Sequence, residues 1–231
     1  MVMPGFGETY ISRRIRLTLA LVISLVLTPV LGNTMPTLPA SPIALAILVI
    51  AEILVGLFIG GICRILISAT HVAGTVFSFQ SGLSSAVIYD VSQSSQGSLM
   101  GNFFGLVTVL LLFSTGMHGF MLRGITESYT VFAPGHFPPI ADFAETAARV
   151  ASDTFMVAIE ISTPMIVIGT LLFLGAGILS RLMPSLQIFF LITPPQIFIN
   201  FFALIAVFSA MMLWYMEFFR DTLLLFFGYL N

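Results

Sequence analysis

Apolar runs about as long as a lipid bilayer is thick fill most of this sequence. A helix that crosses a bilayer needs roughly 20 mostly apolar residues, because hydrocarbon offers no water to the backbone and the helix must satisfy its own hydrogen bonds. Six segments meet this requirement: residues 15–31, 43–66, 69–88, 103–122, 155–180 and 188–215. A shorter apolar tail follows at 218–230. These segments predict about six long apolar helices.

The composition leaves too little polar surface for a soluble domain. Of the 231 residues, 58% are hydrophobic and 8% are charged, and the mean hydropathy is +1.09. A soluble domain carries roughly 25% charged residues, so these helices must face lipid or other protein. The predicted fold class is therefore an all-α integral membrane protein. All eight basic residues are arginines and form no basic patch or tail, which excludes a nucleic-acid partner.

The arginines indicate how six spans would be threaded through the membrane. With the N-terminus inside, seven arginines lie at inner ends of spans: Arg13, Arg14, Arg16, Arg64, Arg123, Arg149 and Arg220. Only Arg181 lies at an outer end, so the distribution agrees with the positive-inside rule. The polar stretch 142–153 predicts the start of an amphipathic, interfacial helix. An alternative for the first arginines and residues 17–31 is a secretory signal, but no small-x-small cleavage pattern follows Leu31.

Residues suited to catalysis or metal binding are scattered. His71, His118 and His136 stand in separate segments without a metal-binding spacing, and the single cysteine, Cys63, lies in an apolar run where it is expected to pack. The sequence contains no Gly-x-Ser-x-Gly elbow, Walker loop or dinucleotide fingerprint. We therefore expect no enzyme activity, no cofactor or metal, and no small-molecule ligand.

Two carboxylates fall inside apolar segments. Glu52 and Glu160 would each cost several kcal/mol in hydrocarbon unless protonated, paired or placed in a wet cavity. They are candidates for an ion path, although pairing with an arginine or polar group of a neighbouring subunit is the favoured interpretation.

Small residues and prolines mark where these helices would pack closely or bend. Gly56 and Gly60 share one helix face, as do Gly101 and Gly105, and both pairs favour close helix packing. Four prolines interrupt apolar stretches and predict kinks or helix breaks there: Pro164, Pro184, Pro194 and Pro195.

Several stretches in a fixed order carry a family resemblance. In chain order they are Pro4 to Leu17, the helix end Thr28-Pro29, Glu52-x-x-x-Gly56-x-x-x-Gly60, Ala73-Gly74, Phe79-Gln80-x-Gly82, Asp90, the helix from Phe103 to Gly119, and Gly177 to Phe189 with Arg181, Pro184 and Gln187. Together they resemble the FliR/SpaR/SctT family of type III secretion export-gate subunits. Val91, the two residues between Pro184 and Gln187, and Pro194-Pro195 depart from the family's usual pattern.

The resemblance implies a non-enzymatic role and an assembly. It implies one membrane-embedded export-gate domain over residues 1–231, with bent helical hairpins in one protein-packed bundle and the family's first N-terminal helix missing. The implied partners are FliP-like, FliQ-like and FlhB-like subunits and unfolded exported proteins, of a flagellum in preference to a virulence apparatus. The implied location is the bacterial inner membrane, in the flagellar basal body.

The resemblance also assigns roles to particular residues. It places a pore plug in the polar connection made by Tyr89, Asp90, Val91, Ser92, Gln93, Ser94, Ser95, Gln96, Gly97 and Ser98. Composition alone favours an ordinary solvated connection there. The helix-packing and motif residues are Glu52, Gly56, Gly60, Gly74, Gln80, Gly82, Arg181, Pro184 and Gln187.

A small-solute secondary transporter is the alternative from a different class. Such transporters often contain inverted repeats and ion-binding residues at mid-span. No convincing repeat of one half appears in the other, and the carboxylates Glu52 and Glu160 lie in unlike contexts. The sequence therefore favours the export-gate subunit.

Overall fold

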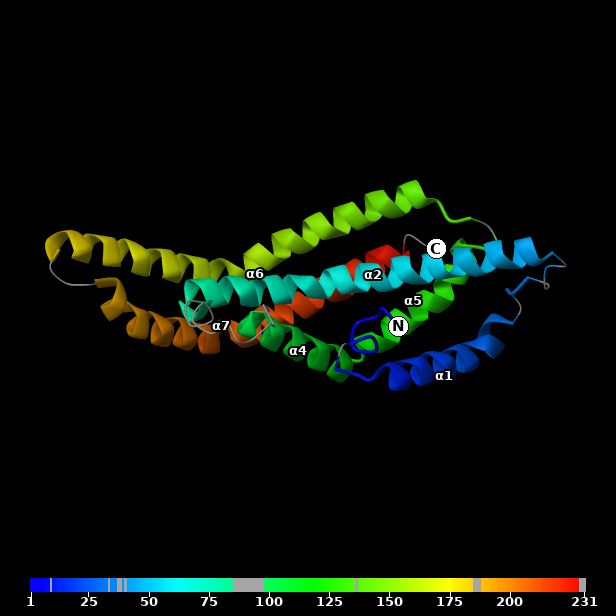
Figure 1. Ribbon diagram of the computed structural model, residues 1–231, viewed down its shortest axis with the longest axis horizontal. Helices are drawn as coiled ribbons and strands as arrows, with labels where there is room; N and C mark the ends of the chain where they lie inside the picture. Colours follow the sequence, from blue (N-terminus) through cyan, green and yellow to red (C-terminus); the bar gives the residue numbers. More distant parts are fainter. Residues whose placement is uncertain are drawn as a thin grey trace. The chain divides into compact units, whose positions relative to one another are not determined.

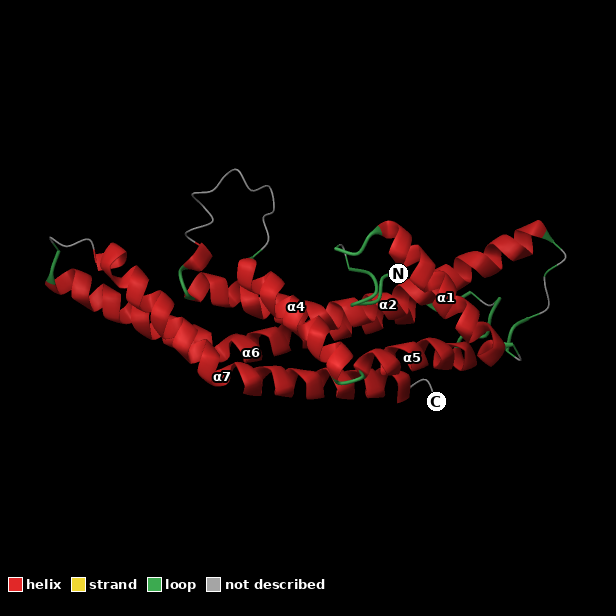
Figure 2. Cartoon of the chain, turned by 90° about the horizontal axis from the view of Figure 1, so that it is seen from below, coloured by secondary structure: helices red, strands yellow, loops and turns green. Residues whose placement is uncertain are grey.

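A computed structural model describes residues 1–8, 10–32, 34–36, 39, 41–84, 98–135, 137–184 and 188–228. The helices are α1 (Arg13–Leu31), α2 (Pro42–Gln80), α4 (Leu99–Ser114), α5 (Met117–Val131), α6 (Ile140–Leu182) and α7 (Ile188–Gly228). Within the described ranges the chain contains helices and loops but no strand (Figure 2). The all-α membrane fold class predicted from the sequence is confirmed.

Three of these helices are too long for simple spans. Helix α2 has 39 residues, α6 has 43 and α7 has 41. At 1.5 Å per residue each is about 60 Å long, roughly twice the thickness of the hydrocarbon core of a bilayer. Part of each helix must therefore lie outside the hydrocarbon or cross it at a steep tilt.

The sequence-based segmentation was wrong in this respect. The segments 43–66 and 69–88 were expected as two spans, but Ile67 and Ser68 continue the helix and α2 ends only at Gln80. The stretch 142–153 does lie at the start of a helix, as predicted, but that helix, α6, continues without a break to Leu182. The tail at 218–230 extends α7 to Gly228. Arg64 and Arg149 consequently lie inside helices and not at helix ends, and the described helices offer four or five candidate spans in place of six.

The predicted span 103–122 is divided in two. Gly116 adopts the left-handed conformation with φ of +74°, which glycine reaches without a Cβ clash and which ends a right-handed helix. Helices α4 and α5 on either side of it are bent by 76°. Four described helices are long and apolar enough to cross a membrane, or five if this bent pair counts as one span.

The prolines interrupt the helices less than their sequence positions suggested. Pro164 lies inside α6, and Pro194 and Pro195 lie inside α7, so none of the three ends its helix. Pro184 instead follows α6 by two residues, in the connection to α7. The second half of α6 and the first half of α7 run back alongside each other as the two arms of a hairpin (Figure 1).

The chain divides into two compact units. The boundaries between them fall inside four helices, α2, α4, α6 and α7. Unit 1 comprises Met1–Ile67, Val109–Ser152 and Glu217–Asn231, and unit 2 comprises Ser68–Thr108 and Asp153–Met216.

Aromatic side chains pack against one another in both units. In unit 1, Phe58 of α2 stacks on Phe143 of α6 with ring centroids 3.7 Å apart. In unit 2, the buried rings of Phe77 and Phe104 lie 6.3 Å apart, and Phe201 packs edge-on against Phe77 at 5.5 Å. These contacts link helices that are far apart in the sequence.

Outside these cores the helices expose large apolar side chains. Helix α1 buries only Leu31, while Leu25 of α1 and Ile43 of α2 are both 74% exposed and Ile205 of α7 is 72% exposed. Apolar surface of this extent is not stable in water and marks contact with lipid or with other protein.

Candidate functional site

Helices α2 and α4 approach each other backbone to backbone in unit 2. A Cβ atom added at Gly74 of α2 would collide with the Met100 carbonyl oxygen and lie 2.7 Å from the Gly101 Cα. A Cβ atom added at Gly101 of α4 would in turn lie 2.8 Å from His71 Nδ1 and 2.9 Å from the His71 carbonyl oxygen. Glycine at both positions is what permits this packing.

Hydrogen bonds between hydroxyl groups join the same two helices. The Thr108 hydroxyl donates to the Thr70 hydroxyl at 2.9 Å, and both residues are buried. The Ser78 and Ser98 hydroxyl oxygens lie 2.8 Å apart. Because each buried hydroxyl has a protein partner, the α2–α4 contact carries little desolvation cost and tolerates little sliding.

The other predicted glycine contacts divide into two groups. In unit 1, a Cβ atom at Gly60 would lie 3.0 Å from Val2 Cβ, so Gly60 lies against the N-terminal segment. A Cβ atom added at Gly56 or at Gly105 would have no other heavy atom within 4 Å. Close packing at these two positions stays a prediction, because no described residue provides it.

The C-terminal end of α2 is held by two amide side chains of α7. Gln196 Nε2 donates to the Gln80 carbonyl oxygen at 2.7 Å, and Asn200 Nδ2 donates to the same oxygen at 3.4 Å and to the Gln196 carbonyl oxygen at 2.9 Å. Gln196 is 3% exposed and Asn200 is fully buried. They satisfy a carbonyl group that the end of a helix otherwise leaves unpaired.

Two further groups complete this end of unit 2. Gly82 has a φ of +79° and turns the chain out of α2, and it lies against the Gln196 side chain. Ser98 stands directly before α4 and accepts a hydrogen bond from the Gly101 N–H at 3.1 Å, as a helix N-cap does. We call the set Ser78, Gln80, Gly82, Ser98, Gln196 and Asn200 the loop base.

The Gln80 side chain is also part of tight packing in unit 2. A Cβ atom at Gly169 of α6 would collide with the Gln80 amide oxygen, so this glycine leaves room for the Gln80 side chain. The loop base thus collects groups from α2, α4 and α7 and borders α6. It lies at both ends of the polar connection in which the pore plug was predicted.

The predicted plug falls almost wholly outside the described residues. The positions from Tyr89 to Gly97 are not described, whereas Ser98 is described as the N-cap of α4. The plug role of this segment therefore stays a prediction. Gln187 also lies outside the described residues, and Arg181 and Pro184 are exposed at the end of α6.

The two carboxylates in apolar segments have different surroundings. The Tyr129 hydroxyl of α5 lies near the Glu52 carboxylate, and both residues belong to unit 1. Glu160 belongs to unit 2 and is exposed. The Glu52 carboxylate thus has a polar neighbour within its own chain, which sequence reasoning did not consider.

Sequence reasoning also missed Gln196 and Asn200. A usable signal was present, since two amides four residues apart lie on one face of an otherwise apolar helix. Polar side chains in such helices are costly unless they bond across to a neighbour. This pattern could have predicted that the pair contacts another helix. It could not have predicted which helix.

A valine at Gly82 tests the turn at the loop base. We expect Gly82→Val to lower the free energy of unfolding by about 1–2 kcal/mol, because a left-handed backbone brings the Cβ of an L-residue against the following carbonyl oxygen. Unfolding is measured by titrating dodecyl sulfate into mixed micelles of the purified chain. Gly175→Val is the control, since Gly175 lies in α6 with open space around it. Equal stability of the two variants would contradict the assignment.

The long apolar helices, the exposed apolar surface and the polar base around one connection define a helical membrane protein. The model of the family described as bacterial export proteins, family 1, matches residues 1–222. The chain belongs to this family. The family resemblance read from the sequence is therefore confirmed.

Curated relatives with the name flagellar biosynthetic protein FliR are similar to this chain along most of its length. The relative from Caulobacter vibrioides is 30% identical over 96% of this chain and 89% of its own. The relative from Bacillus subtilis is 32% identical over 71% of this chain and 64% of its own. The relative from Escherichia coli is 24% identical over 80% of this chain and 70% of its own.

Proposed function

We propose that this chain is a non-enzymatic subunit of the flagellar protein export gate in the bacterial inner membrane. In this proposal it forms, with FliP-like and FliQ-like subunits and in contact with an FlhB-like subunit, the pore through which unfolded flagellar proteins leave the cell. Family membership and the FliR relatives support the export role.

Two physical features support a role inside an assembly. Helices about twice as long as a bilayer is thick need protein around the part that the hydrocarbon cannot cover. The large apolar side chains exposed on α1, α2 and α7 offer the surface for such contacts. Partner subunits would cover this surface without any change in the fold of the chain.

The loop base is the observation that carries the plug assignment. The chain leaves α2 at the Gly82 turn and enters α4 at the Ser98 cap, and partly buried hydrogen bonds hold both of these points. A plug has to move aside for substrate while its ends keep their place. A hydrogen-bonded base with a small, polar connection of serine and glutamine residues meets this requirement.

Shortening the connection while sparing its base tests the plug. We expect deletion of residues 89–97, with Ser98 retained, to make the assembled gate leak ions, because the ends of α2 and α4 stay anchored and the closing segment is lost. Leak is measured as collapse of the membrane potential in cells that express the gate, with a potential-sensitive dye.

The matched control replaces residues 89–97 by nine glycine and serine residues, which keeps the length of the connection. A partial leak in this control is consistent with the plug. A gate that stays as tight as the parent after the deletion, while still exporting protein, would remove the plug assignment and leave the export role intact.

A further inference from the structure

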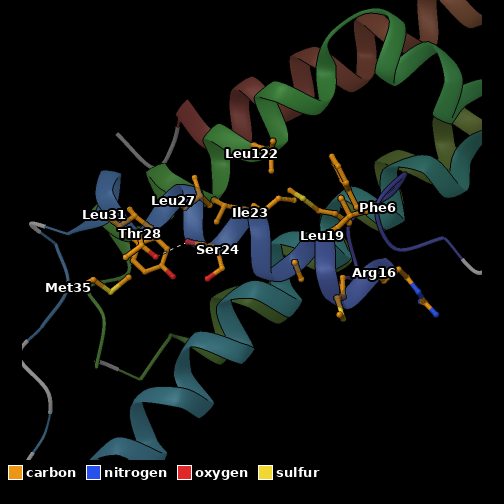
Figure 3. Close-up of a pocket in the computed structure, with 15 residues that line it drawn as sticks. Phe6, Arg16, Leu19, Ile23, Ser24, Leu27, Thr28, Leu31, Met35 and Leu122 are labelled. Carbon is orange, nitrogen blue, oxygen red and sulfur yellow. Dashed lines mark hydrogen bonds between the residues drawn. The ribbon is translucent and has the colours of Figure 1, made fainter. Parts of the chain in front are cut away.

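A cavity of about 270 Å³ lies between α1 and α5 within unit 1. Its wall is made by apolar side chains of both helices, among them Leu19, Ile23 and Leu27 of α1 and Leu122 of α5. Figure 3 shows Ile23 and Leu27 on the side of α1 that faces Leu122. The cavity is open on one side and its wall also contains Ser24 and Thr28, but most of the wall is apolar and is readily covered by an apolar group.

One end of the cavity carries an arginine with an unsatisfied donor. Arg16 lines the cavity, and its Nε atom is buried without a hydrogen-bond partner. The ion pairs of the described residues are Arg149 with Glu145 and Arg220 with Asp221, so no described carboxylate forms a salt bridge with Arg16. In Figure 3 the guanidinium group extends beyond the end of the row of apolar side chains.

The surroundings of Arg16 favour an anion. The first turn of α1 contains no acidic residue, and Arg13 and Arg14 stand beside Arg16 with exposed side chains. A guanidinium group binds a phosphate through two parallel hydrogen bonds, which would satisfy the Nε donor. The outer face of α1, with Leu21 62% exposed and Leu25 74% exposed, is suited to lie against lipid tails.

We propose that this cavity is a binding site for an anionic phospholipid. One acyl chain would lie between α1 and α5 against Ile23, Leu27 and Leu122, and the phosphate of the headgroup would pair with Arg16. The arrangement fits such a lipid because an apolar slot ends at an unsatisfied cation. The inference does not depend on the plug or on the pore.

The test uses the purified full-length chain in detergent after lipid removal. Palmitoyl-oleoyl-phosphatidylglycerol or palmitoyl-oleoyl-phosphatidylcholine is titrated in, and bound lipid is counted by native mass spectrometry. Both lipids carry the phosphate, so the comparison measures net charge. We expect the first phosphatidylglycerol to bind about tenfold more tightly than phosphatidylcholine, because the choline cation of phosphatidylcholine is repelled by the Arg16 guanidinium group. Arg16→Gln should abolish this preference, and Arg16→Lys should retain part of it.

Two further variants separate this site from a general surface charge. Arg13→Gln removes the same charge from the same turn of α1 but does not alter the cavity wall, and it should keep most of the preference. Ile23→Trp should fill the slot and weaken the binding of both lipids. Circular dichroism confirms that each variant keeps its helical content, and Ile23→Trp and Arg16→Lys still test the site if Arg16→Gln unfolds.

Three results would overturn the proposal. The first is equal binding of the two lipids by the parent chain, and the second is an equal loss of preference in Arg16→Gln and Arg13→Gln. The third is displacement of phosphatidylglycerol by millimolar inorganic phosphate, which would indicate a free-anion site that does not hold an acyl chain.

Discussion

An alanine at Gly74 is expected to lower the free energy of unfolding by about 2–3 kcal/mol, the range of an overpacked core position. The added Cβ would collide with the Met100 carbonyl oxygen and the Gly101 Cα, which are backbone atoms of α4 and cannot rotate away. Alanine gains about 1 kcal/mol over glycine in helix propensity, so the measured loss is smaller than the steric cost alone. Because α2 and α4 both end at the loop base, export should fall as well.

The measurements are dodecyl sulfate titration of the purified chain and flagellar motility of cells that carry the variant. Gly105→Ala is the matched control, since Gly105 lies in α4 of the same unit and has no heavy atom within 4 Å of an added Cβ. It should be as stable as the parent or slightly more stable. Equal stability of Gly74→Ala and Gly105→Ala would show that α2 and α4 do not pack as described.

The Gly105→Ala control also tests whether a partner subunit packs against Gly105. A Gly105→Ala chain that unfolds like the parent but abolishes motility would place a partner subunit against this glycine. Normal motility of the variant would instead leave the position facing lipid or open space.

The second large effect is expected from Gln196, whose side chain bonds to the end of α2. We expect Gln196→Met to lower the free energy of unfolding by about 2 kcal/mol, since the Gln80 carbonyl oxygen loses its 2.7 Å donor and keeps only the 3.4 Å contact from Asn200. Methionine nearly preserves the volume of glutamine, so a cavity does not account for the loss. Dodecyl sulfate titration measures the change.

A double-mutant cycle shows whether the two amides act on the same carbonyl group. Because Gln196 and Asn200 share the Gln80 oxygen, the effects of Gln196→Met and Asn200→Leu should not add. The control is Thr170→Val on the exposed surface of α6, whose hydroxyl bonds only to its own helix at Ile166. If Gln196→Met were no more destabilising than this control, the hydrogen bond to Gln80 would not contribute to stability.

The sequence allowed the secondary structure to be predicted well and its boundaries poorly. Long, mostly apolar segments of bilayer length are expected to be helical in a membrane, because every backbone group needs a partner. The same uniformity hides where one helix ends, so the continuation of α2 through Ile67 and Ser68 was missed. The break at Gly116 was missed as well, since a glycine inside an apolar run gives no sign of its φ until its neighbours are placed.

What the sequence by itself determined was the class: helical, membrane-embedded, and a member of an export family whose motifs recur in order along the chain. Only the tertiary structure decided which residues meet within the chain, namely Gly74 with Gly101 and Gln80 with Gln196, and which of them, such as Gly56, have open space beside them. The physical reason is separation along the chain. The bond between Gln80 and Gln196 spans 116 positions, and periodicity within one helix carries no information about which distant helix lies opposite.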